Sequence, residues 1–222
     1  MTVSNRGATV TETEERSGWY ASGSAPFQRV ANLSDGIFAI ALTLLVLAIE
    51  IPDVAPGQLA GAMQDQVPQV IAFVISFALV AHYWWIHHRF FARLTAVEPG
   101  LIALNLLLLG CVALVPYPSG LLGQDPTARA AVLLYLAVIG ALSIVHVLLL
   151  VRAHVTDVLD PAIPHGGFRY AVTAWGSGIV TVAVGMVLAW WIPVLGLVAL
   201  LLTWPLEALV TRLSPTHLRG TF

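Results

Sequence analysis

Long apolar runs without charge are the feature that most constrains this chain. One of them extends from Ile37 to Ile49 and ends at Glu50 and Pro52. Five further runs follow, each near the ~20 residues that cross ~30 Å of hydrocarbon. The chain is 58% hydrophobic and only 10% charged, with a mean hydropathy of +0.86, whereas soluble domains carry about 25% charged residues. We therefore predict an all-α integral membrane protein, a six-helix bundle embedded in a lipid bilayer.

The expected organisation is a tail, a six-helix domain and a second tail. Residues 1–25 are polar and lack the apolar core of a signal peptide, so we predict a disordered tail there. Residues 26–213 form the helical domain, and residues 214–222 follow it as a short tail. A short interfacial helix is possible in the link after the first helix, and the third helix should end where VPYPSG begins. The predicted helices are 27–51, 67–88, 100–115, 127–151, 169–191 and 194–212.

The arginines predict the orientation in the membrane. Nine of the ten fall on the side shared by the two termini, and only Arg129 falls on the other. Because cytoplasmic loops carry the excess of basic residues, both termini should be cytoplasmic. The chain has no lysine and many alanines, which favours a GC-rich bacterial genome and hence a bacterial plasma (inner) membrane. Acidic residues in the opposite loops could attract cations, or could be ordinary loop residues: Glu50, Asp53, Asp65 and Asp125.

Several classes of partner and site are not indicated. The net charge is −2 and there is no basic patch, so no nucleic-acid partner is expected. Cys111 is the only cysteine and lies in an apolar run, so it can form neither an intrachain disulfide nor a zinc site by itself. His82, His87 and His88 are too few and too divergent in direction for a structural metal site. Glu207, in the last helix, should reach the interface or pair with Arg212, although proton coupling is the alternative.

A polar cluster at the start of the first helix is unusual for a membrane span. Ser34 and Asp35 precede the uncharged run, and an aspartate there is costly unless it has a partner or faces water. The two residues could form a cation-attracting ring at a pore entrance. We favour a packing network instead, in which donors on the second and third helices fix the first helix. The candidate donors are His82, Trp84, His87 and Asn105.

The chain resembles the prokaryotic branch of the transmembrane protein 175 potassium-channel family. That family's signature is Phe-Ser-Asp preceded by an arginine, and here it reads Leu33-Ser34-Asp35 after Arg29. Further matches cover about the first 120 residues in the right order: Trp84, His87, Arg89, Asn105 and Pro116 through Leu121. The resemblance implies a homotetramer with a central pore lined by the first helix. It also implies passive conduction of monovalent cations with a preference for potassium, without a cofactor or catalytic residues.

Ile40, Leu44 and Leu47 are the candidate constriction of that pore. Their i, i+4, i+7 spacing puts them on one face of a helix, where four copies would form three apolar rings. Periodicity alone is weak evidence, because nearly every residue of this helix is apolar. The resemblance places the family's constriction at these positions. It also suggests a selectivity role for Thr43, whose hydroxyl could alternatively bond to the carbonyl of Ala39.

Two other functions compete with the channel. A secondary transporter is the main alternative, although the second half of the chain shows no copy of the first-helix motif. An intramembrane enzyme would need a nucleophile or metal set near a base, and only the histidines near the second helix offer one. We therefore predict a channel rather than an enzyme. Saturating flux that depends on a second ion would favour the transporter.

Overall fold

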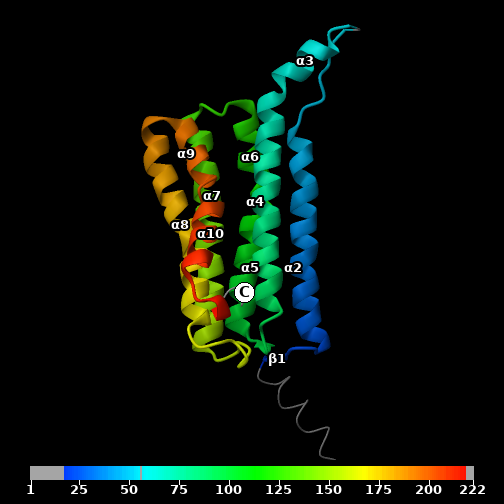
Figure 1. The fold of residues 1–222 in the computed structure, drawn as a ribbon. Helices are drawn as coiled ribbons and strands as arrows, with labels where there is room; N and C mark the ends of the chain where they lie inside the picture. The colour runs from blue at the N-terminus through cyan, green and yellow to red at the C-terminus, as the bar shows by residue number, and fades with distance from the viewer. Residues whose placement is uncertain (1–17, 56, 219–222) are drawn as a thin grey trace, which may run out of the picture.

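The computed structural model describes residues 18–55 and 57–218. Within them, six helical spans are long and apolar enough to cross a membrane, and they stand side by side as a bundle (Figure 1). This architecture confirms the predicted six-helix membrane fold. The spans are α2 with the short 3-10 helix η1 (Ala25–Leu44, Leu45–Ala48), α4 (Val67–Phe91), α5 with α6 (Pro99–Leu114, Pro116–Gln124), α7 (Arg129–Val155), α8 (Gly167–Trp191), and α9 with α10 (Pro193–Leu200, Thr203–Leu213).

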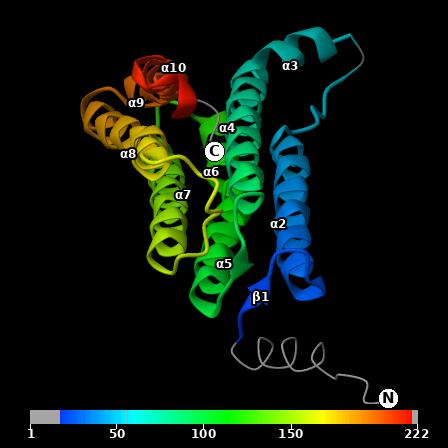
Figure 2. The ribbon, with the colours of Figure 1, turned by 60° about the horizontal axis from the view of Figure 1, so that its bottom comes forward.

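The core is built around α7. In its most apolar stretch 61% of the residues are buried, against 22% in the first and last spans. Fully buried side chains of α7 include Tyr135, Leu136, Leu142 and Leu149. The neighbours of α7 are α5, α6, α8 and α9, whereas α2 contacts mainly α4 and α5. As a result α2 lies at one edge of the bundle, with α8 and α9 at the opposite edge (Figure 2).

Prolines divide two of the spans. Pro116 has no N–H to continue the α5 ladder, and the preceding Val115 instead bonds to the carbonyl of Val112 at 3.1 Å. The helix resumes at once as α6, so the prediction that the third helix ends at 115 is wrong. Pro205 is likewise incompatible with a helical carbonyl four residues earlier, and the chain breaks at 201–202 between α9 and α10. The single helix predicted at 194–212 is therefore two helices.

The ends of the bundle carry short ordered segments. β1 (Tyr20–Ala21) pairs antiparallel with β2 (Ala96–Val97), so the prediction of disorder up to residue 25 is wrong for residues 18–24. The helix α2 then begins with Ser24 as its N-cap, whose hydroxyl accepts from the Phe27 N–H at 3.3 Å. Residues 1–17 of the predicted tail lie outside the described residues. The short helix α3 (Leu59–Asp65) lies in the link after α2.

The C-terminal segment folds back onto the bundle. A 3-10 helix, η2 (Thr216–Leu218), follows α10, and the Leu218 side chain is buried. A Cβ placed on Gly166 would lie 3.6 Å from the Leu218 side chain, so η2 packs beside the start of α8. Residues 219–222 of the predicted tail are outside the described part of the chain.

Candidate pore-lining face and its anchoring network

The helix α2 has one buried face and one open face. Its buried side chains are Phe27, Ser34, Phe38 and Ala41, and α2 packs against α4 and α5. Leu45, at the start of η1, is also buried, and η1 packs against α6 and α4. On the opposite face Ile40 is 58% exposed and Leu44 41%, and Leu47, in η1 directly after α2, is 75% exposed. The three candidate constriction residues therefore share a face that no other part of the described chain covers.

Thr43 lies on the same open face. Its hydroxyl donates to the carbonyl of Ile40 at 2.8 Å, so the predicted bond to Ala39 is wrong by one residue. The bond occupies the hydroxyl hydrogen and leaves oxygen lone pairs free to accept. Thr43 can therefore be held by its own helix and still present an oxygen to a cation.

Ser34, Asn105 and His87 form a buried chain of hydrogen bonds across three helices. The Asn105 amide donates to Ser34 Oγ at 3.0 Å, and its carbonyl oxygen is 2.8 Å from His87 Nε2. Ser34 Oγ in turn donates to the carbonyl of Val30 at 3.0 Å. The three side chains are each about 1% exposed, so this network fixes α2 against α4 and α5 where water cannot compete.

Asp35 is anchored separately. It lies on the exposed side of α2, where the Trp84 indole N–H donates to Oδ1 at 2.9 Å. Of the four candidate donors for Asp35, only Trp84 bonds to it. His87 and Asn105 join Ser34 instead, and Arg29 lies exposed at the start of the helix. The structure thus separates the two signature residues, with Ser34 in a packing network and Asp35 at the surface.

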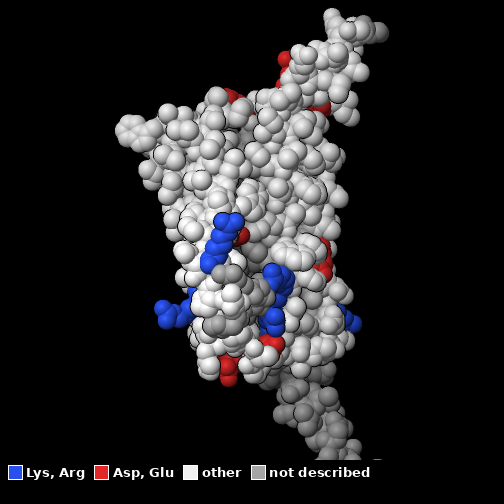
Figure 3. Space-filling model, viewed as in Figure 1, with Lys and Arg blue, Asp and Glu red and all other residues white. Residues whose placement is uncertain are grey.

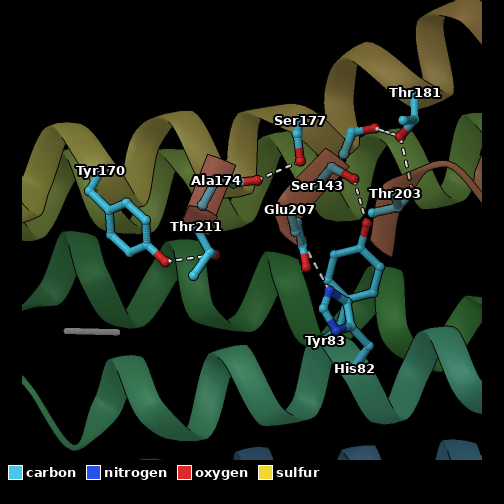
Figure 4. A network of polar contacts seen from close by, with 11 residues as sticks. His82, Tyr83, Ser143, Tyr170, Ala174, Ser177, Thr181, Thr203, Glu207 and Thr211 are labelled. Atoms are coloured by element: carbon cyan, nitrogen blue, oxygen red, sulfur yellow. Dashed lines mark hydrogen bonds and ion pairs between the residues drawn. The ribbon is translucent and has the colours of Figure 1, made fainter. Parts of the chain in front are cut away.

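A second polar cluster occurs between α4, α7, α8 and α10, where the sequence indicated none (Figure 4). His82 Nε2 lies 3.2 Å from Glu207 Oε1, although His82 was expected at Asp35 and Glu207 near the interface or Arg212. Tyr83 and Ser143 share a hydrogen bond of 2.6 Å one residue further along α4. The available signal was two ionisable residues in separate apolar spans. Their pairing depends on how α10 turns after the break at 201–202.

Charged groups gather at the ends of the spans. On the face shown in Figure 3, the arginines lie in the lower half, toward the end that carries β1. Glu98 caps α5 by accepting from the N–H groups of Gly100 and Leu101 at 2.7 and 2.8 Å, and the Arg152 guanidinium donates to it at 2.8 Å. These donors, Arg152 above all, hold the pKa of Glu98 below its usual range. On the opposite side Arg129 lies over the Trp190 ring, 5.5 Å from its centroid.

Comparisons with known proteins agree on one family. Residues 29–116 match the family model described as endosomal/lysosomal potassium channel TMEM175. A potassium channel from Streptomyces collinus is 39% identical over 121 residues, which are 52% of this chain and 59% of that protein. The crystal structure of a lysosomal potassium-selective channel TMEM175 homologue from Chamaesiphon minutus superposes with a TM-score of 0.74. It is 29% identical, and the match covers 84% of this chain and 99% of that one.

Over residues 29–116 the chain is similar to the TMEM175 family. Its sequence match to the curated bacterial relatives spans only about 60% of their length, 59% for the Streptomyces protein and 61% for a potassium channel from Chamaesiphon minutus. Mouse endosomal/lysosomal proton channel TMEM175 is 31% identical over 159 residues, which are 65% of this chain and 32% of the mouse protein. The stretch matched by the TMEM175 model contains most of α2 and all of α4 and α5, which are the helices of the anchoring network.

Proposed function

We propose that this protein is a potassium-preferring cation channel in which four copies surround a central pore lined by α2. The open face of α2 is the observation that carries the proposal. A membrane helix held by one face, with the other uncovered at Ile40, Leu44 and Leu47, is suited to meet copies of itself around an axis. The buried Ser34–Asn105–His87 network would keep that face at a fixed rotation.

The chemistry of the open face suits a narrow, dry passage. Four copies of the three apolar residues would give rings that oppose ion passage by dewetting. A ring of four Thr43 hydroxyl oxygens one residue before Leu44 would replace part of the hydration shell of potassium. The Asp35 carboxylate, held by Trp84 beside the open face, would attract cations toward the arginine-rich entrance. We place that side in the bacterial cytoplasm, with both termini there.

Currents across planar bilayers under a potassium/sodium gradient test the proposal. Wild-type protein should give discrete currents that reverse near the potassium potential. Leu44→Ala should enlarge the conductance or weaken the selectivity, because it widens one ring of the constriction. Leu195→Ala is the matched control, since Leu195 is a similarly exposed leucine on α9, 42% against 41%. Equal conductance and selectivity in wild type and Leu44→Ala would contradict the pore-lining role of this face.

Flux measurements separate the channel from the alternatives. Uptake into vesicles that saturates and needs a second ion would favour a secondary transporter. The mouse relative is named as a proton channel, so the same vesicles should also be tested with a pH gradient and no potassium gradient. A channel with the proposed preference moves potassium passively down the potassium gradient and does not need a second ion.

A further inference from the structure

His146 is a buried histidine whose ring makes no hydrogen bond to the described residues. Its exposure is 2%, and neither Nδ1 nor Nε2 has a partner there. Aromatic rings surround it, with centroids at 5.5 Å for Tyr83, 5.9 Å for His87 and 5.7 Å for Trp175. A buried polar ring without a hydrogen bond is expensive, most of all in a membrane span. The ring nitrogens of His146 therefore need a hydrogen-bond partner from outside the protein chain.

A small cavity lies beside this histidine. About 10 Å³ of it is open to the centre of a water-sized sphere, which is about the space that one water needs. Its walls offer polar groups on several sides, which is the second condition for holding a water. Besides His146 they include His82, Tyr83, Ser143, Thr203 and Glu207.

A larger cavity connects the same residues to the outside of the bundle. Its volume is about 270 Å³, and it shares His82, Ile86, Trp175 and Glu207 with the small cavity. It continues toward Arg89, Tyr170 and Thr211, at the end of the bundle where the arginines gather. Figure 4 shows the His82–Glu207 pair between the Tyr170–Thr211 bond on one side and the Tyr83–Ser143 bond on the other. Water can thus approach the pair from that end.

We propose that the small cavity is a binding site for one water molecule, which bridges His146 to the His82–Glu207 pair. The larger cavity supplies this water from the arginine-rich side. Each chain then contains a hydrated site for exchangeable protons, with one carboxylate and two imidazoles, on the opposite side of α4 from α2. A carboxylate, an imidazole and a water in hydrogen-bond contact exchange protons readily.

Several ionisable groups surround the site. From α4 come His82, Tyr83, His87 and Arg89, from α7 His146, from α8 Tyr170, and from α10 Glu207. His87 contacts both parts of the molecule. Its ring lies against His146, and its Nε2 bonds Asn105, which also bonds Ser34 of α2. Only the His87 ring therefore separates His146 from the rest of the network that anchors α2.

Gly178 provides a specific way to remove the water. A Cβ at Gly178 would lie 3.5 Å from Ser143 Oγ and 3.8 Å from the Tyr83 hydroxyl, which are ordinary contacts. Gly178 also lines the small cavity, so Gly178→Ala should fill it without a clash. Gly176→Ala is the matched control on the same helix, because a Cβ there meets nothing within 4 Å.

Solid-state NMR of the full-length protein in bilayers, with ¹⁵N-labelled histidine, tests the proposal. Magnetisation from water should reach the His146 ring several-fold faster than the ring of His87, whose Nε2 is hydrogen-bonded to Asn105 rather than to water. Gly178→Ala should abolish that difference, and Gly176→Ala should keep it. The His146 signals are identified by their loss in His146→Phe, or by correlation to the backbone where that variant does not fold.

Two results would overturn the proposal. One is a His146 ring in the wild type that receives no water magnetisation and has ¹⁵N shifts of nitrogens without hydrogen bonds. The other is transfer that persists unchanged in Gly178→Ala. Neither result depends on whether the protein conducts ions, because the measurement records hydration alone.

Discussion

Asn105 is the residue that joins the candidate pore helix to the rest of the chain. Its side-chain amide bonds Ser34 on α2 and His87 on α4 at the same time. An aliphatic residue in its place would leave the buried His87 nitrogen unpaired and remove the only side-chain bond of Ser34 to another helix among the described residues. The identity of the amide therefore matters more than its volume.

Asn105→Leu keeps the branched shape and the number of heavy atoms and tests this directly. We expect a loss of about 1–3 kcal/mol of unfolding free energy, the usual cost of an unsatisfied buried group. Thermal unfolding in detergent would measure it as a lower midpoint. Leu107→Ala is the control on the same helix, because Leu107 is 54% exposed and should cost much less. Equal midpoints for wild type and Asn105→Leu would contradict the proposed contribution of the Ser34–Asn105–His87 network to stability.

The lowered pKa of Glu98 predicts how the stability of the folded protein depends on pH. The pKa of Glu98 in the folded chain is lowered, so the unfolded chain binds more protons and stability decreases as pH decreases. The contribution of Glu98 is complete above its usual pKa of 4.5 and is lost as pH falls through the lowered value. Comparing unfolding of wild type and Glu98→Gln across this range isolates the effect from other carboxylates. The stability gap should close on acidification, and a gap that widens would contradict this sign.

At the scale of single residues, the sequence could predict which side chains are special but not all their partners. Ser34, Trp84, His87 and Asn105 were recognised because polar groups in a membrane span need partners. The sequence could not indicate that Trp84 bonds Asp35 while Asn105 bonds Ser34, because that choice depends on the rotation of α2. His146 was not singled out, although it too is an ionisable residue in an apolar span.

At the scale of elements, glycines allow α8 and α9 to approach closely. A Cβ on Gly196 would lie 2.6 Å from the Ala189 Cβ and 2.7 Å from the carbonyl oxygen of Gly185. Such distances are possible only without a side chain, which is typical of tight helix contacts in membranes. The hairpin turn between the two helices, at Ile192 and Pro193, depends on this contact.

Gly196→Ala should therefore force the two helices apart. The expected cost is about 1–3 kcal/mol, because the methyl group meets backbone rather than a flexible side chain. Gly176→Ala, with nothing near its Cβ, should leave stability equal or slightly higher. Thermal midpoints of both variants and of wild type, measured side by side, check this. A harmless Gly196→Ala would mean that the α8–α9 contact is looser than its distances indicate.

The apolar runs predicted the existence of every span, while the prolines misled in two of them. A proline can end a helix, bend it or start the next one, and the sequence alone does not distinguish these outcomes. At Pro116 the helix resumes at once, and at Pro205 it breaks four residues earlier. The break at 201–202 determines where α10 lies, and hence why Glu207 meets His82 rather than the interface.

At the scale of the whole molecule, the open face of α2 is the feature that most directly indicates assembly with other copies of the chain. The six-helix class followed from composition and run length, because the bilayer permits few other folds. The assembly does not follow in the same way, since the residues that would meet across an axis are apolar, as are those that meet lipid. The lone Cys111, half-buried on α5, can be removed to leave a background for labels.

Distances between spin labels test the central claim, that this face of α2 surrounds a four-fold axis. In a Cys111→Ser background, labels at Leu47→Cys should give two short distances in a ratio of about 1.4, the side and diagonal of a square. Labels at Leu195→Cys on α9 should give clearly longer pairs in the same ratio. Distances at residue 47 that equal or exceed those at residue 195, or no distances between copies, would contradict the pore proposed here.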